Sequence, residues 1–303
     1  ANGVTYIREM MGNTKHLQWR DEINQGRIGP KMFVATAKLQ STGWFEGWFN
    51  HWTRKDINVN TENKTNSILA SLKDQGFDAV KLGSQLDRDT YLALNLISKK
   101  TAIPIIGHLS LSADLNDLWN GNQKELAHIE ELVKALDREF GGYNRNNTDE
   151  YIAFVNQRSA EVANNLVKNN IAVVSTLNLM ESFPRQKHEL KQILSEVQLP
   201  YVNQGLSEGT PITSGGLGWL TKVNHYRLND DYPLERLGGN KTYWQTYAKA
   251  NQILLKAMAQ KKVKVLAGTD ANNSVMVPGF SMHDELISLT KSGMSNSQAL
   301  LSA

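Results

Sequence analysis

The sequence contains no cysteine, which excludes disulfides, thiolate metal sites and a cysteine nucleophile. Any bound metal must therefore be held by histidine, by a carboxylate or by a modified side chain. No apolar run is long enough to span a bilayer, so a membrane is not an expected partner. Basic and acidic residues number 33 and 30, a net charge of +3 without a basic stripe, so nucleic acid is not expected either.

The first residues, Ala1-Asn-Gly-Val-Thr5, show neither the basic nor the apolar part of a signal peptide. The compartment is left open for this soluble chain, with a periplasmic or secreted location slightly favoured over a cytoplasmic one. A homo-oligomer is left open as well. With 303 residues, 40% of them hydrophobic, the chain is long enough for one large α/β domain or two small ones.

Seven short segments rich in apolar and β-branched residues alternate with segments of helical periodicity. They lie near residues 4, 33, 79, 105, 127, 173 and 265. This alternation predicts a parallel sheet and an α/β fold, a TIM-type (β/α) barrel. Because a closed barrel has eight βα units, we expect an incomplete barrel whose first strand is missing. No linker divides the chain, so residues 1–303 are expected to form a single partial barrel domain.

Several segments outside the strands also carry predictions. Ser281 and Ser295 are predicted helix N-caps, the second with Gln298 in the position that a capping box requires. The aromatic-rich segment 44–52 is predicted to be either a packed lid or a wall of a substrate pocket. The irregular stretch 200–242 is so long that we expect it to be functional.

Four of the predicted strands end in a residue that can bind a divalent metal or act on water: Lys81, His108, His128 and Asp270. Taken singly, such a lysine is usually solvated and such a histidine is usually a hydrogen-bonded structural residue. The carboxyl ends of parallel barrel strands meet on one face, however, so four such residues are expected to converge. Two imidazoles and a carboxylate suit zinc or a similar ion, which lowers the pKa of bound water to about 7. Asp270 could then take a proton from that water.

Two further residues are assigned to substrate binding. Arg8, at the end of the first predicted strand, could pair with a substrate carboxylate, and an intramolecular salt bridge is an equal alternative. His283 follows the Pro278-Gly279 turn at the lip of the expected site. For His283 and the nearby Glu285, an ordinary helix N-terminus is the simpler explanation, because an acid is favourable in the first turn.

Six motifs, taken in order, resemble the amidohydrolase superfamily. They match its second, fourth, fifth, sixth and eighth strands and its final helix: Gly3-Val-Thr-Tyr-Ile-Arg8, Phe77-Asp-Ala-Val-Lys-Leu82, Ile106-Gly-His108, Ala127-His-Ile-Glu-Glu131, Ala267-Gly-Thr-Asp-Ala271 and His283-Asp-Glu-Leu-Ile287. The branch that the chain resembles most contains imidazolonepropionase-like enzymes and metal-dependent Xaa-Pro, Xaa-Arg and Xaa-Lys dipeptidases.

The resemblance implies a metal-dependent hydrolase of a carbon–nitrogen bond in a small molecule or dipeptide. It implies that His108 and His128 are ligands of one or two divalent ions, with zinc the first choice. It also implies that Asp270 is both a ligand and the base that transfers the proton. In members with two metals, Lys81 would be a carboxylated bridging ligand.

Two features depart from the family pattern. The family's first strand supplies two ligands from a His-x-His pair, and no His-x-His occurs in this sequence. The small β-sandwich that family members build around the barrel has no counterpart either. We therefore expect a barrel fragment of a larger enzyme, which binds metal weakly at best.

Two alternatives compete with the hydrolase. The first is a metal-free barrel that acts as a binding module for a peptide or carbohydrate. The second is a glycosidase that uses Glu130 and Glu131. We rank the glycosidase low because adjacent residues on a strand point to opposite faces and cannot flank one bond.

Overall fold

The computed structural model describes residues 2–43, 51, 56–59, 62–209, 218–221, 223–224, 226 and 239–303. The described chain forms two compact units. Unit 1 comprises residues 3–131 and 168–173, and unit 2 comprises residue 2 with residues 132–167 and 174–303. Of the aromatic segment 44–52 only His51 is described, and the stretch 200–242 is described in part, so both predictions about them lie outside the described residues. A single domain over residues 1–303 stays a prediction.

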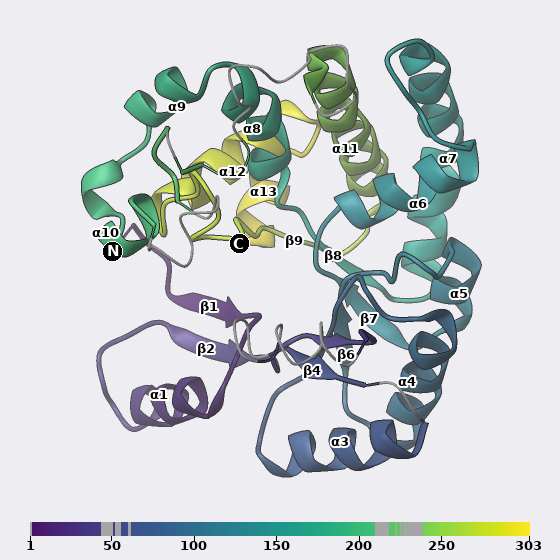
Figure 1. Ribbon diagram of the computed structural model, residues 1–303, viewed down its shortest axis with the longest axis vertical. Helices are drawn as coiled ribbons and strands as arrows, with labels where there is room; N and C mark the ends of the chain where they lie inside the picture. The colour runs from purple at the N-terminus through teal and green to yellow at the C-terminus, as the bar shows by residue number, and fades with distance from the viewer. Residues whose placement is uncertain are drawn as a thin grey trace. The chain divides into compact units, whose positions relative to one another are not determined.

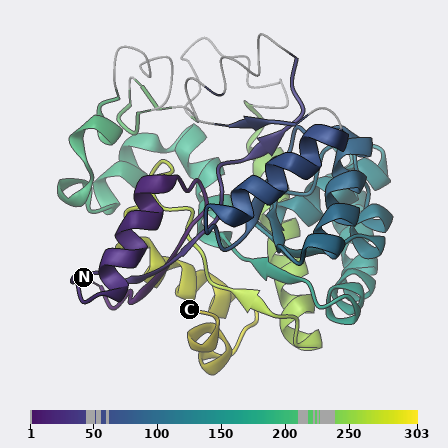
Figure 2. The same ribbon diagram turned by 90° about the horizontal axis from the view of Figure 1, so that it is seen from below.

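Unit 1 holds the first part of the α/β alternation. Its elements are β1 (Tyr6–Glu9), α1 (Thr14–Asn24), β2 (Lys31–Val34), β3 (Leu39–Gln40), β4 (Ile57–Asn58), α3 (Glu62–Asp74), β5 (Val80–Leu82), α4 (Arg88–Thr101), β6 (Ile105–Gly107), α5 (Leu115–Asn120) and β7 (Gln123–Leu126). Helix α1 lies alongside β1 and β2, and helices α3, α4 and α5 follow one flank of strands β5 to β7 (Figure 1, Figure 2).

The remaining elements belong wholly or mostly to unit 2, except that β8 is shared between the units. They are α6 (Glu130–Phe140), α7 (Thr148–Lys168), β8 (Ala172–Val174), α8 (Leu177–His188), α9 (Leu190–Glu196), a 3-10 turn (Leu199–Tyr201), α10 (Gln204–Ser207), α11 (Lys241–Lys261), β9 (Val265–Leu266), α12 (Phe280–Lys291) and α13 (Asn296–Ser302). In the described part of the chain, no helix combines the length and the apolar character needed to cross a membrane.

The strands form parallel sheets. Strands β1 and β2 pair with each other, and the other seven run in the order β4-β3-β5-β6-β7-β8-β9. A parallel bridge between Ala35 and Ala79 joins the continuation of β2 to that of β5. In unit 2, Ser175 N donates to Leu266 O at 2.9 Å and so ties the end of β8 to β9. This α/β fold with a seven-stranded parallel sheet confirms the predicted class and is consistent with an incomplete barrel.

Apolar side chains explain why these short strands form. Leu39, Val80, Leu82 and Ile105 are completely buried, as a strand covered on both faces requires. In unit 2, α8 packs against α11 and α12. Its residue Phe183 contacts the rings of Tyr226 and Trp244, so α8 is held mainly by burial of its apolar face.

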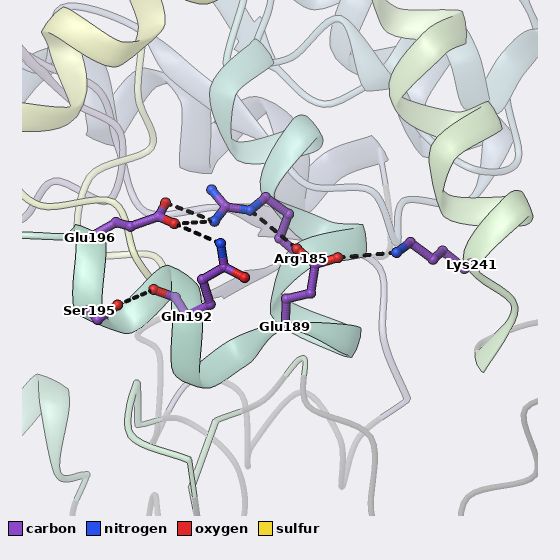
Figure 3. A network of polar contacts seen from close by, with 6 residues as sticks. All are labelled: Arg185, Glu189, Gln192, Ser195, Glu196 and Lys241. Carbon is purple, nitrogen blue, oxygen red and sulfur yellow. Dashed lines mark hydrogen bonds and ion pairs between the residues drawn. The ribbon is translucent and has the colours of Figure 1, made fainter.

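A polar network ties α8, α9 and α11 together on the surface of unit 2 (Figure 3). Arg185 donates to both carboxylate oxygens of Glu196, at 2.8 and 2.7 Å. Lys241 donates to Glu189 at 3.1 Å, and Gln192 donates to Glu196 at 3.3 Å. The hydrogen bond from Arg185 lowers the pKa of Glu196 below its ordinary value. Exposed pairs of this kind contribute little to stability, so the network mainly fixes local geometry.

The predicted cap at Ser295 is confirmed, and the one at Ser281 is wrong. Ser295 and Gln298 form a capping box at the start of α13. Helix α12 begins two residues earlier than predicted, with Gly279 at its N-cap and a positive φ of 83°. Ser281 lies inside the helix, where its hydroxyl donates to Val277 O at 2.5 Å.

The sequence did not predict helices α6 and α8. Helix α8 contains Pro184 in its interior, a residue that normally argues against a helix because it lacks the N–H donor. The short strand predicted near residue 127 lies earlier in the chain, since β7 ends at Leu126 and α6 begins at Glu130. His128 therefore lies in the turn between strand and helix.

Candidate functional site

His108 directly follows strand β6, at the carboxyl end of the sheet in unit 1. Its backbone N–H donates to Leu82 O at 3.0 Å, which fixes it beside the end of β5. The preceding residue, Gly107, has φ 112°, and a Cβ there would lie 2.5 Å from Leu82 O. Only glycine fits so close an approach, so Gly107 determines where the backbone delivers His108.

His128 lies next to His108 within unit 1. Ala127 N donates to Gly107 O at 2.8 Å, which aligns the ends of β6 and β7. The two imidazole rings have centroids 5.2 Å apart and are tilted by 46°. Two predicted ligands thus meet at the carboxyl ends of neighbouring strands, as the barrel prediction required.

A buried carboxylate orients the His108 ring. Glu131 is 1% exposed, lies in the first turn of α6, and places its Oε1 2.9 Å from His108 Nδ1. A carboxylate oxygen accepts, so we assign the proton to Nδ1, which leaves a lone pair on Nε2 for a ligand. Carboxylates of this kind commonly support histidines that bind metal.

Sequence reasoning missed the role of Glu131. It placed Glu130 and Glu131 on a strand, whereas both lie at the start of a helix, so the strand-face argument against a glycosidase does not apply. Glu131 follows His128 by three residues, and Glu131 N donates to His128 O at 3.3 Å. That spacing at a helix start is the signal that could have indicated a supporting carboxylate.

Gln123 is a second residue that the sequence did not single out. Its buried amide donates to Gly107 O at 3.0 Å and to Glu125 O at 3.1 Å. Its carbonyl accepts from the Tyr91 hydroxyl at 2.9 Å. Gln123 therefore holds the backbone at the end of β6, just before His108.

Lys81 lies on β5 and is 8% exposed. Its backbone N–H donates to the buried Thr36 hydroxyl at 3.0 Å. A Cβ at Gly107 would lie 3.0 Å from Lys81 Cγ, so this side chain runs close to the residue that precedes His108. Lys81 is in register with Ile106, two residues before His108, so it lies on the strand next to the one that His108 follows.

Arg8 forms an intramolecular salt bridge. Its Nη2 donates to Glu125 Oε1 at 2.8 Å and to Oε2 at 2.7 Å. The guanidinium also lies over the Phe33 ring, 4.2 Å from the centroid. A substrate carboxylate would have to compete with Glu125, so a role of Arg8 in substrate binding stays a prediction.

The two remaining predicted site residues lie in unit 2. Asp270 is exposed, four residues beyond β9, in a left-handed conformation of φ 50°. Its Oδ2 accepts from Asn273 Nδ2 at 3.1 Å. His283 is exposed in the first turn of α12, with Nε2 3.2 Å from Asn2 O.

The donors in unit 1 fit part of a zinc site. The described residues contain no group of three or more histidine or carboxylate side chains arranged to hold a metal ion. The His108–His128 pair nevertheless supplies two imidazoles, the ligand type that zinc prefers, and Glu131 supports one of them. A lysine can join such a set only when it has lost its charge, for example by carboxylation.

No protein-family model matches the chain, and no curated protein matches it in sequence. Solved structures do match it over its whole length. A bottromycin amidohydrolase aligns with a TM-score of 0.65 at 19% identity, and a Xaa-Pro dipeptidase with bound methionine aligns with 0.58 at 13%. An A. niger ochratoxinase aligns with 0.58 at 14%. The chain has the amidohydrolase fold.

The amidohydrolase fold confirms, at the level of architecture, the resemblance drawn from the sequence motifs. The chain covers 60% of the bottromycin amidohydrolase, 63% of the dipeptidase and 59% of the ochratoxinase. It therefore spans about three-fifths of the length of these amidohydrolase-fold proteins.

Proposed function

We propose that this chain contributes the histidine ligands and the catalytic base of a metal-dependent hydrolase that cleaves a carbon–nitrogen bond. The adjacent imidazoles of His108 and His128, one supported by buried Glu131, carry the proposal. Lys81 is proposed as a further ligand, on the strand next to the one that His108 follows. Asp270 is proposed as ligand and base because its motif resembles the eighth strand of the family.

Each proposed residue has a distinct task. A divalent ion, when bound, polarises the substrate carbonyl and lowers the pKa of a water to about 7. Glu131 keeps the proton on Nδ1 of His108, so that Nε2 keeps the lone pair that a metal ligand needs. The Asp270 carboxylate takes a proton from the attacking water and donates it to the leaving nitrogen as the carbon–nitrogen bond breaks.

We propose a small amide or a dipeptide as substrate. One structure with the same fold is a Xaa-Pro dipeptidase holding methionine in its active site, and another is a prolidase with N-methylphosphonate-L-proline. His283, exposed at the start of α12, is retained as the proposed substrate-binding residue. Because Arg8 is engaged by Glu125, we place it second to His283.

Metal content tests the proposal first. The purified chain is loaded with zinc, dialysed, and measured by elemental analysis beside a His108→Ala/His128→Ala variant. His16→Ala, a histidine substitution on α1 of the same unit, is the matched control. With zinc kept in the dialysis buffer, we expect the wild type and the control to bind up to one or two equivalents weakly, since the His-x-His pair is absent, and the double variant to bind none.

Activity is measured next with a panel of Xaa-Pro, Xaa-Arg and Xaa-Lys dipeptides. Hydrolysis that depends on zinc and disappears in Asp270→Asn supports the assigned base. Equal zinc content in the wild type and the double histidine variant would overturn the metal site, and the chain would then be pursued as a binding module.

A further inference from the structure

Helix α12 carries a carboxylate that is completely buried in unit 2. Glu285 is 0% exposed, yet it has three hydrogen-bond donors. Its Oε1 accepts from the Ser175 hydroxyl and from Leu177 N, the latter at 2.9 Å, and its Oε2 accepts from Asn178 N at 2.8 Å. A buried carboxylate is costly unless it is satisfied in this way, so its position calls for an explanation.

The donors to Glu285 belong to the start of helix α8. The N-cap of this helix, Thr176, has φ 44° and makes no side-chain cap bond, because its hydroxyl donates to Ser175 O. The first N–H groups of a helix need an acceptor from elsewhere. Glu285 supplies it from another helix, and its carboxylate, when ionised, places negative charge at the positive end of the α8 dipole.

The same turn of α8 holds the segment that carries Asp270, here called the Asp270 loop (residues 267–276). Thr176 N donates to Gly268 O at 3.1 Å. Asn178 Nδ2 donates to Met276 Sδ at 3.5 Å. The two ends of the Asp270 loop are therefore bonded to residues on either side of Leu177, whose own N–H is bonded to Glu285.

The Asp270 loop needs such external support. Asp270, Asn272 and Val275 all have positive φ, at 50°, 74° and 63°. This region is unfavourable for residues other than glycine, and most of all for a β-branched residue such as Val275. A strained segment persists only where its surroundings determine its conformation.

We propose that Glu285 is a positioning residue for Asp270. By capping α8 from α12, it fixes the turn to which both ends of the Asp270 loop are bonded, and so sets the direction of the Asp270 carboxylate. The assignment rests on the proposed function in one respect, that Asp270 acts as the base. The mechanical coupling of Glu285 to the loop is independent of that function.

A second, part-buried set of hydrogen bonds holds α8 farther along the helix. Glu181, farther along α8, accepts from Ser288 at 2.7 Å and from Gln252 at 2.6 Å. These bonds attach the middle of α8 to α12 and α11. Loss of the Glu285 cap should therefore release the first turn without detaching the helix.

Glu285→Gln is the test variant. The amide keeps the size of the side chain and one acceptor oxygen, but it turns an NH2 group toward a backbone N–H. Glu196→Gln makes the same chemical change on the exposed network of Figure 3 and is the matched control. Hydrogen–deuterium exchange is followed in residues 177–180 and 267–276, with residues 80–86 of unit 1 as internal reference.

We expect exchange in both segments to become about tenfold faster in Glu285→Gln, the size expected for losing a helix cap, and to stay unchanged in Glu196→Gln. If Glu285→Gln does not fold, Ser175→Ala removes one donor to the same carboxylate and should show a smaller change of the same pattern. Faster exchange at 177–180 with an unchanged Asp270 loop would overturn the coupling.

Kinetics separate this inference from the proposed function. With a dipeptide that the wild type hydrolyses, Glu285→Gln should lower kcat about tenfold and leave KM unchanged, because the base is misplaced while binding is kept. An unchanged kcat beside faster loop exchange would overturn the positioning of Asp270. If the wild type hydrolyses no substrate, the proposed function fails, and the exchange data alone decide the coupling.

Discussion

Replacing Glu131 is the perturbation with the most direct consequence for the proposed metal site. Its carboxylate is 1% exposed and 2.9 Å from His108 Nδ1, so the bond is shielded from water. In Glu131→Gln a neutral amide oxygen still accepts from Nδ1–H, but a charge-assisted bond is roughly twice as strong as a neutral one. We expect zinc affinity to fall about tenfold, or ~1.4 kcal/mol.

Glu131→Ala removes the acceptor altogether and should weaken zinc binding about 100-fold, or ~2.7 kcal/mol. Affinity is measured by competition with a chromophoric chelator at fixed pH. Glu139→Gln, on the same helix and paired with Arg158 at the surface, is the control and should bind zinc like the wild type. Equal affinities in the wild type and both Glu131 variants would refute the supporting role of this carboxylate.

Three further predictions concern stability. Burial raises the pKa of Glu285 to about 7 from its ordinary 4.5. The folded state therefore holds a proton that the unfolded state releases between these values. The free energy of unfolding should accordingly fall by about 3 kcal/mol as pH rises from 4.5 to 7. Urea unfolding at a series of pH values checks this, and in Glu285→Gln the free energy of unfolding should depend less steeply on pH. An equally steep dependence in that variant would exclude Glu285 as the source of the pH effect. Gly107→Ala should cost about 3 kcal/mol, because its Cβ would meet Leu82 O at 2.5 Å; a melting temperature equal to that of the wild type would show that the close approach can relax. Arg8→Ala should lower stability by about 2 kcal/mol, since Arg8 pairs with Glu125; a selective rise in KM for dipeptides would support the substrate contact proposed for Arg8, and an unchanged KM would exclude it.

The arrangement of His108 and His128 could be predicted because it follows from one rule of parallel sheets. Strand ends share an edge, so residues that follow neighbouring strands are brought together whatever the intervening helices do. Seven of the strand segments were visible as short runs of apolar and β-branched residues, whereas β3 and β4 were not predicted. The resulting α/β class and the proximity of the two histidines are both seen in the structure.

The residues that orient the site were not predictable by the same route. Glu131 and Gln123 act through contacts across the sheet, and their own sequence positions resemble an ordinary helix start and an ordinary strand residue. Glu285 was likewise explained by its own helix, whereas its hydrogen bonds go to the start of α8. Helix α8 was not predicted because Pro184, in its interior, normally argues against a helix. In the structure, tertiary burial of the helix outweighs this local preference of proline.

The spectroscopic environment of bound zinc tests the central claim most directly. X-ray absorption of the zinc-loaded chain should show imidazole scattering from two histidines with zinc–nitrogen distances of about 2.0–2.1 Å. One of the two should disappear in His128→Ala and the other in His108→Ala. A zinc spectrum without imidazole scattering, or one that is identical in the wild type and both variants, would contradict the assignment of this histidine pair as the metal ligands.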